Sequence, residues 1–293
     1  MSTLVQVLLN GTGRGAIFAL LALGFVVIYK ATEVINFAHG SLALFGGYLT
    51  FELKSQIGWF AGALCGVLGA ALLGFLLERI LLARARMASE DSLAILTIGV
   101  DIFILTEISR RLGTAAAPFL GDPYQEIRFT VLGASVEGPQ IVALLTALVL
   151  IAVFFAAFRW SSWGLAMRAQ SENKEAAALM GIRSSRVTAS AWAVGGALAG
   201  IAILFIATLP IAGGAGLTAA HTIAFAAFPA AILGGLTSPG GAVVGGLVVG
   251  LAEAFSQQYI SQDFAKVAVY LVMLVVLVAR PSGLFGQVEQ RRV

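Results

Sequence analysis

Charged residues are scarce in this chain. Only 11% of the 293 residues are Asp, Glu, Lys or Arg, whereas 59% are hydrophobic. Soluble domains typically contain about 25% charged and about 45–50% apolar residues. The composition therefore excludes an ordinary soluble protein. It predicts an all-α, polytopic transmembrane helical bundle, because a helix satisfies its own backbone hydrogen bonds inside a bilayer.

Cysteine is almost absent as well. Cys65 is the only one, which excludes an intramolecular disulfide and any site built from several cysteines. The sequence has no GxxxxGK[ST] phosphate-binding loop, no HExxH motif and no GxSxG motif. We therefore expect no catalytic residue, no metal site, no cofactor and no enzyme activity. No basic stripe with interleaved aromatic residues occurs, so we expect no nucleic-acid partner.

Long apolar runs divide the chain into about eight to nine membrane segments, some of them broken or short. We treat residues 1–293 as a single transmembrane domain. The expected segments are 16–29, 42–51, 59–77, 93–112, 141–158, 187–209, 223–236, 242–255 and 265–279. Glycine pairs spaced four residues apart, such as Gly62/Gly66 and Gly196/Gly200, predict close contacts between helices.

Two of these segments are interrupted, one in each half of the chain. Asn36, His39 and Ser41 follow the first long run and lead straight into the second. His221 and Pro229 lie at a comparable place after the run that ends near residue 209. Paired broken segments in the two halves of a membrane protein point to its transport path. These five residues are the candidate translocation pathway, although interhelical hydrogen bonding would also explain the polar ones.

Three acidic residues, Asp101, Glu107 and Glu253, lie inside expected segments. Acidic side chains in a bilayer are costly and often functional, so a proton relay is one interpretation. Structural pairing is the other. We favour pairing because Arg110 and Arg111 follow Glu107 at helical spacing.

A charged island at about 160–186 interrupts the apolar chain. It contains the stretch WGLAMRAQSENKEAAALMGI at 163–182, in which a short helix of small residues would end at Gly181. A small apolar face on such a loop predicts a docking site for a soluble partner, and a solvated loop with an incidental helix is the alternative.

Basic residues gather in the stretch 78–91, in this island and in the C-terminal tail. The positive-inside rule places these three stretches, and hence the C-terminus, in the cytoplasm. The acidic, proline-containing stretch at about 113–140 is then an external loop. The side of the N-terminus stays open.

Four stretches resemble one known family: GRGAIFALLALGFVVIYKATEVINFAHGSLALFGGYL at 13–49, GLAMRAQSENKEAAALMGI at 164–182, FPAAILGGLTSPGGAVVGGLVVGLAE at 228–253 and RPSGLFG at 280–286. They are similar to the membrane-spanning permeases of ATP-binding-cassette (ABC) importers for branched-chain amino acids, specifically the H-type subunit of the LIV system. The likeness covers nearly the whole chain.

This resemblance implies a multi-pass permease subunit in a bacterial inner membrane. It implies two ATPase subunits that bind the ATP, a related permease as the other half of a heterodimer, and a periplasmic protein that delivers hydrophobic amino acids. Through the matched motif, Glu175, Ala176, Ala177 and Gly181 would couple the chain to the ATPases. Local charge adds Arg168 and Asn173 to this set.

Other functions stay open from the residues alone. Similar permeases are thought to carry urea or short-chain amides, and the sequence does not separate these substrates. A secondary transporter driven by protons through the three acidic residues is a further alternative, and a passive channel is another. Neither a homodimer nor a heterodimer is excluded.

Overall fold

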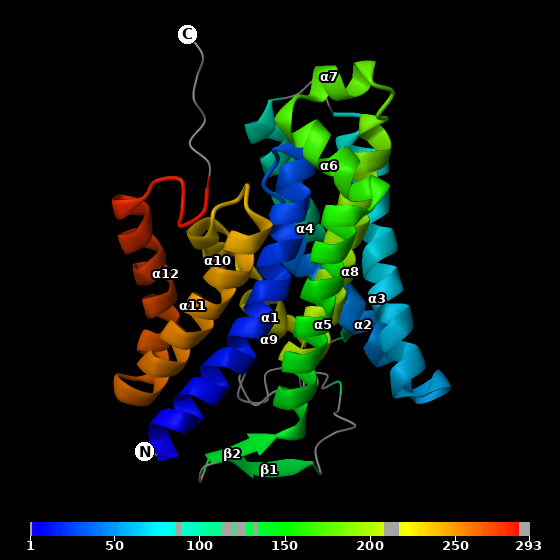
Figure 1. Cartoon of the computed structure of the whole chain (residues 1–293). Helices are drawn as coiled ribbons and strands as arrows, with labels where there is room; N and C mark the ends of the chain where they lie inside the picture. The colour runs from blue at the N-terminus through cyan, green and yellow to red at the C-terminus, as the bar shows by residue number, and fades with distance from the viewer. Residues whose placement is uncertain are drawn as a thin grey trace.

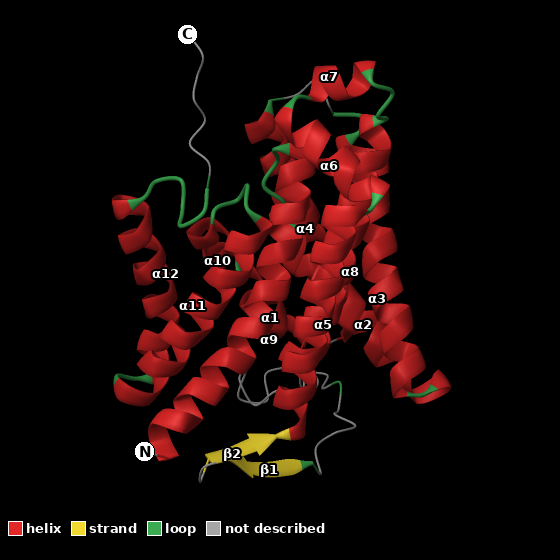
Figure 2. Cartoon of the chain, viewed as in Figure 1, coloured by secondary structure: helices red, strands yellow, loops and turns green. Residues whose placement is uncertain are grey.

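The computed structural model describes residues 2–85, 89–112, 120, 127–131, 134–207 and 217–286. Within these ranges the chain is a bundle of helices with one small β-hairpin (Figure 2). The helices are α1 (Ser2–Thr32), α2 (His39–Ile57), α3 (Trp59–Leu76), the π-helical turn η1 (Leu77–Leu82), α4 (Glu90–Leu112), α5 (Gly138–Trp160), α6 (Ser162–Glu172), α7 (Lys174–Leu179), α8 (Ser184–Ile206), α9 (Leu217–Phe225), α10 (Phe228–Gly234), α11 (Pro239–Tyr259) and α12 (Gln262–Ala279).

Seven helices of the described chain are long and apolar enough to cross a membrane: α1, α3 with η1, α4, α5, α8, α11 and α12. Two further segments are broken or short. One is α2, which carries charge near its end, and the other is the α9–α10 pair. The prediction of an all-α bundle with about eight to nine segments is confirmed.

Several helices extend beyond the predicted apolar runs. Helix α1 begins at Ser2 rather than near residue 16, and it keeps Asn10 and Arg14 inside its length. These polar side chains find partners at one end of the bundle: Asn10 Oδ1 accepts from Gln6 and Gln140, and Arg14 faces Glu253 of α11. Hydropathy underestimates helices whose polar turns are satisfied by neighbouring segments.

Part of the predicted loop at 113–140 has regular structure. Strands β1 (Arg128–Val131) and β2 (Ala134–Glu137) pair antiparallel, with Arg128 opposite Glu137. The hairpin is fixed to the start of α1, because Gln6 donates to Ser135 O and accepts from Ser135 N, both at 2.9 Å. Pro118 and Pro123, two of the prolines in that predicted loop, lie outside the described residues.

The two ends of the bundle differ (Figure 1). The start of α1 and the hairpin lie at one end, whereas α6, α7 and the end of α12 lie toward the other. The beginning of the described chain is therefore at the end of the bundle opposite the charged island.

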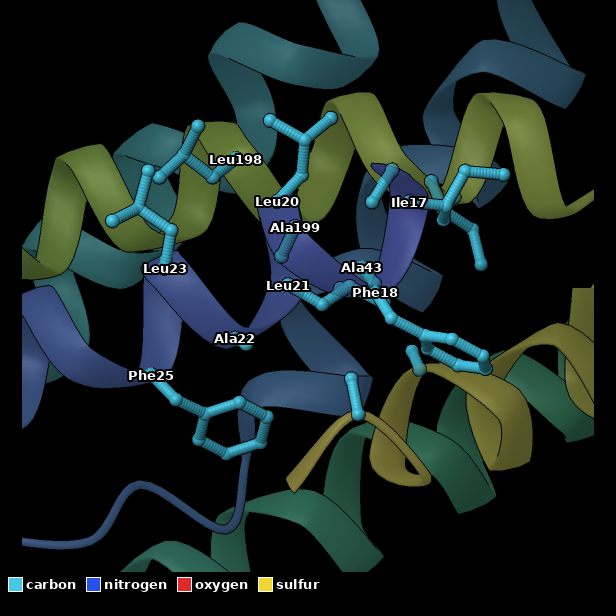
Figure 3. Packing of buried hydrophobic residues seen from close by; sticks show 14 of the residues in the cluster. Ile17, Phe18, Leu20, Leu21, Ala22, Leu23, Phe25, Ala43, Leu198 and Ala199 are labelled. Carbon is cyan, nitrogen blue, oxygen red and sulfur yellow. The ribbon is translucent and has the colours of Figure 1, made fainter. Parts of the chain in front are cut away.

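Helix α1 forms the centre of the core. Its residues from Ala16 to Ile28 are almost all buried. Figure 3 shows Leu20, Leu21 and Phe25 of α1 among side chains from α2 and α8, including Ala43 and Leu198. A helix that is apolar all round belongs inside a bundle rather than on its surface.

The two halves of the chain are built on one pattern with inverted direction. In the first half, α1 is followed by a break, α2, α3 and α4; in the second half, α8 is followed by a break, α9–α10, α11 and α12. Helix α1 packs along α11, and α8 packs along α3, while α2 and α10 each pack on the next long helix of their own half. Inverted repeats of this kind recur in membrane transporters.

Glycines allow the closest contacts in this pattern. A Cβ added at Gly250 of α11 would overlap the backbone of Gly15 in α1. A Cβ added at Gly196 of α8 would likewise overlap the backbone of Ala70 in α3. Small residues at such crossings let backbones approach, as the glycine pairs predicted.

Candidate functional site

The first break, residues 33–38, is held by α4. Phe37 N donates to Thr97 Oγ1 at 3.0 Å, and Asn36 Oδ1 accepts from Ala38 N at 3.0 Å as the chain turns into α2. Backbone groups freed at membrane depth must be satisfied within the protein. Here polar side chains of α4 and of the break itself satisfy them.

The second break separates α9 from α10. Helix α9 ends at Phe225, α10 starts at Phe228, and Pro229 lies buried in the first turn of α10. Proline is well tolerated there, because the first N–H groups of a helix have no intrahelical partner. Pro229 thus begins a new helix at the interruption that the sequence predicted.

The helices next to the two breaks meet at a largely buried polar cluster formed by Ser41, Asp101 and His221. Ser41 Oγ donates to Asp101 Oδ1 at 2.5 Å. His221 Nε2 lies 3.0 Å from the same carboxylate oxygen and 3.5 Å from Ser41 Oγ. Ser41 is fully buried, and His221 nearly so. Residues from α2, α4 and α9 therefore share one carboxylate in the interior of the bundle.

Four phenyl rings, from Phe25, Phe37, Phe225 and Phe228, lie close to one another at the two breaks. Phe37 lies four residues before Ser41, and Phe225 lies four residues after His221. The rings of Phe37 and Phe228 are 5.6 Å apart, those of Phe37 and Phe225 6.2 Å, and those of Phe25 and Phe228 5.5 Å. The rings of Phe37, Phe225 and Phe228 are only half-buried, which leaves an apolar surface at the two breaks.

His39 and Asn36 occupy a tighter environment. His39 is fully buried, with its ring 4.2 Å from that of Phe25 and with Gly24 too close to allow a side chain there. Neither ring nitrogen makes a well-formed hydrogen bond with a described residue, and only a weak approach to the Leu21 backbone is present. Asn36 Nδ2 also lacks a partner among the described residues. The role of Asn36 and His39 in the pathway stays a prediction.

The other two acidic residues are paired, as we favoured. Glu107 receives bidentate hydrogen bonds from Arg110 at 2.8 Å and one from Arg111 at 2.7 Å. Glu253 faces Arg14 at 3.4 Å. Asp101 differs from both because it pairs with His221 instead of an arginine.

The charged island folds as two short helices at one end of the bundle. Asn173 caps α7, accepting from Ala176 N at 2.9 Å, and Glu175 follows in the exposed first turn. The helix stops at Gly181, whose φ is +84°, while Ile182 N donates to Ala177 O and Gly181 N to Ala178 O. These bonds form a Schellman motif, which confirms Gly181 as the helix stop.

The exposed part of α7 is apolar at its tip. Leu179 and Met180 are 88% and 84% exposed, next to exposed Ala176, whereas Ala177 turns inward. Arg168 also points inward: its guanidinium donates to Phe158 O and stacks on the Phe158 ring, joining α6 to α5. A hollow of about 620 Å³ lies beside α7, lined by residues of α6, α8 and the Gly181 turn.

Comparison with known proteins matches residues 7–278 to the family described as branched-chain amino acid transport system / permease component. The chain belongs to this family. The high-affinity branched-chain amino acid transport system permease protein LivH of Escherichia coli (strain K12) is 30% identical over 312 aligned positions, covering 99% of this chain and 97% of that protein. No solved structure matches the chain significantly.

Other organisms have similar proteins. The permease protein BraD of Pseudomonas aeruginosa is 29% identical, covering 99% of this chain and 98% of its own length. A protein of Methanocaldococcus jannaschii named as a probable branched-chain amino acid transport permease is also 29% identical, over 92% of this chain. The matches run through both halves and both breaks, so the site described above lies within the shared region.

Sequence reasoning missed part of this site. Thr97 and the phenyl rings were not singled out, and Asp101 was considered only as a proton-relay or structurally paired acid, not as a partner of Ser41 and His221. A signal was present, since Leu93, Thr97, Ile104 and Ile108 form the buried stripe of α4 and Asp101 lies on the same side. Polar residues spaced by one helical turn on an otherwise apolar span mark the face that turns toward the protein interior.

Proposed function

We propose that this protein is the membrane-spanning permease subunit of an ATP-driven importer that translocates branched-chain amino acids. The observation that carries the proposal is the family match across nearly the whole chain. All of the relatives described above are named as branched-chain amino acid transport permeases. The seven long apolar helices support a multi-pass protein of the inner membrane.

The chemistry at the two breaks suits such a substrate. An α-amino acid with an apolar side chain carries a cationic ammonium group that a carboxylate can bind, together with a hydrocarbon end that phenyl rings can bind. Asp101, which pairs with His221, supplies a carboxylate, and Phe37, Phe225 and Phe228 supply half-buried rings at the two breaks. Urea lacks a hydrocarbon end, so this surface favours the amino acid over the urea alternative.

A proton-driven mechanism receives less support. A relay needs acidic groups that are free to exchange protons along a path. Glu107 is already held by two arginines at the surface, and Glu253 faces a third. An external source of energy fits better, and α7 offers the surface through which it would act.

We infer that α7 is the contact with the ATPase subunits. Its tip exposes Leu179 and Met180 at one end of the bundle, where a hydrophobic contact with a soluble partner would bury them. Helix α6 links this tip to the core, because Gln170 Nε2 donates to Ala31 O at 2.8 Å, at the end of α1. Movement of α7 would therefore reach the helix that precedes the first break. A second permease and a periplasmic binding protein complete the proposed assembly, and its C-terminus would be cytoplasmic.

The test is co-expression of the chain with its partner subunits, purification and reconstitution. Wild type should carry an ATPase through purification and should accumulate leucine in proteoliposomes only with ATP. The variant Leu179→Glu, Met180→Glu should lose the ATPase, because two carboxylates would have to be buried at the contact. Glu90→Arg, an exposed change at the start of α4 toward the same end, is the matched control and should keep it. Leucine uptake without ATP, or an ATPase that stays bound to the double variant, would overturn the proposal.

A further inference from the structure

The hollow beside α7 carries positive charge that the proposed function does not use. Its volume is about 620 Å³, and its walls come from α6, the Gly181 turn and the first turns of α8. Arg183 and Arg186 are the only charged residues among the described residues that line it. The other lining residues are apolar or carry a hydroxyl group. The hollow therefore suits a ligand with a negative charge.

The two arginines are available to such a ligand. Both are exposed, and neither guanidinium forms an ion pair with a carboxylate of the described residues. A smaller hollow of about 250 Å³ lies at the start of α7, and it is lined by both Lys174 and Glu78. Opposite charges balance there, whereas the charge of the larger hollow is positive only.

The larger hollow lies at the level where two membrane spans end. The span of α5 ends at Trp160, just before the lining begins at Ser162, and the span of α8 begins at Ser184. Trp160 is 78% exposed, and Val149 and Val153 are exposed on the same face of α5. Tryptophan at the end of an apolar face is typical of the membrane–water interface. The hollow is therefore at the level of the lipid head groups.

An apolar wall faces the two arginines across the hollow. Trp163 is fixed in this wall, because its Nε1 donates to Ser190 Oγ at 2.8 Å and its ring lies 6.2 Å from that of Phe154. Ala166 and Val187 complete the wall. Helices α5, α6 and α8 come together toward this end of the bundle (Figure 1). The site thus combines cations with an apolar surface at the boundary of the bilayer.

We propose that this hollow binds the head group of an anionic phospholipid from the leaflet on the side of α7. The phosphate would accept hydrogen bonds from Arg183 and Arg186, since guanidinium groups bind phosphate strongly. The glycerol backbone would lie on Trp163, and the acyl chains would follow the exposed face of α5. Basic pockets between helices on the cytoplasmic side of a membrane are typical sites for anionic lipids.

This proposal goes beyond the proposed function, because it does not depend on which solute the protein carries. An acidic segment of a protein partner is the other occupant that two arginines could take. The lipid is favoured because the hollow lies at the level of the head groups and has an apolar wall, whereas the exposed tip of α7 is formed by Leu179 and Met180.

The experiment counts the lipids bound to the purified full-length chain in detergent by native mass spectrometry. The probes are dioleoyl phosphatidylglycerol, which is anionic, and dioleoyl phosphatidylcholine, which is zwitterionic and has the same acyl chains. The first phosphatidylglycerol should bind about tenfold or more tightly than phosphatidylcholine. Arg183→Gln with Arg186→Gln should weaken phosphatidylglycerol binding about thirtyfold and remove the preference, because two basic side chains are lost from the site.

Two further variants separate the hollow from general surface charge. Arg79→Gln with Arg84→Gln removes the same charge from exposed positions near this end of the bundle that do not line the hollow, so affinity should change less than threefold. Ala166→Trp fills the hollow and keeps both arginines, and it should weaken phosphatidylglycerol binding about tenfold. Each variant is compared only if it elutes as a single species with the melting temperature of wild type, and Ala166→Trp tests the site independently of the arginine variant.

Several results would overturn the proposal. These are equal affinity for the two lipids, unchanged phosphatidylglycerol affinity in the Arg183→Gln, Arg186→Gln variant, and an equal loss in the Arg79→Gln, Arg84→Gln control. Displacement of phosphatidylglycerol by 1 mM inorganic phosphate would indicate a site for soluble anions instead. In co-expression with the partner subunits, loss of the ATPase from the Arg183→Gln, Arg186→Gln variant with unchanged lipid affinity would assign the arginines to a protein contact.

Discussion

The two halves of the chain have the same order of helices, but different residues form the hydrogen bonds at their interrupted segments. Helix α4 of the first half serves both interruptions: Thr97 binds the first break, and Asp101 binds His221 of the second. Helix α12, its counterpart, carries no charged residue after Lys266 and packs on α10 and α11. An inverted repeat thus supplies the framework, while polar residues on one helix create the site.

The two histidines make the same point on a smaller scale. Each follows the long first helix of its half, yet His39 is enclosed by α1 without a well-formed hydrogen bond, and His221 shares a carboxylate with Ser41. Corresponding places in a repeat do not imply corresponding chemistry. The predictions below test first what the halves have in common and then what separates them.

The largest expected effect concerns the shared framework. Gly250→Val would drive a side chain into Gly15, and Gly196→Val would drive one into Ala70, in both cases against backbone that cannot yield easily. We expect each variant to lose roughly 3 kcal/mol of stability, the upper part of the overpacking range. Thermal unfolding of the purified chain in detergent, followed by size-exclusion chromatography, measures both.

Gly240→Val is the matched control for this pair. Gly240 lies in the first turn of α11, and a Cβ there meets no atom within 4 Å. The stability of the Gly240→Val variant should stay within about 0.5 kcal/mol of wild type. If only one of the two core variants were destabilised, the α1–α11 and α3–α8 crossings would contribute differently to stability. The two halves would then share the order of their helices but not the energetics of their packing.

The next effect separates the histidines. His221→Leu removes a partner of the Asp101 carboxylate, and we expect a loss of roughly 2 kcal/mol, typical of a hydrogen bond to a charged group. His39→Leu removes no well-formed bond and keeps a similar volume, so its cost should stay below about 1 kcal/mol. Thermal stability and ATP-dependent leucine uptake should both fall much more for His221→Leu. Equal losses would contradict the distinction between the two sites.

Much of the fold could be predicted from the sequence, because long apolar runs and glycine spacing report directly on spans and close crossings. The breaks could be located too, since Asn36 and Pro229 interrupt apolar runs visibly. The ends of the helices could not be predicted as well. Helix α1 continues through Asn10 and Arg14 because Gln140 and Glu253 meet them, and these partners lie more than 100 residues away.

The site was only partly predictable for the same reason. Ser41 and His221 were candidates from their places in the two breaks, but Asp101 joins them across 60 and 120 residues of sequence. Arg168 and Asn173 were assigned to docking by local charge. The structure shows Arg168 joined to the end of α5 and Asn173 capping α7, contacts that depend on where the chain turns.

The smallest expected effect concerns how the α6–α7 segment is attached to each half. Toward the first half, Lys174 pairs with Glu33 at 2.8 Å, with both side chains nearly half exposed. Toward the second half, Trp163 Nε1 donates to Ser190 Oγ at 2.8 Å in a partly buried contact. Lys174→Gln should cost no more than about 0.5 kcal/mol, and high salt should erase the difference, because exposed ion pairs are weak and screened. Trp163→Phe should cost about 1 kcal/mol at any salt concentration. Melting temperatures at low and high salt compare the two, and a larger or salt-independent loss for Lys174→Gln would mean that the first half holds the segment more firmly.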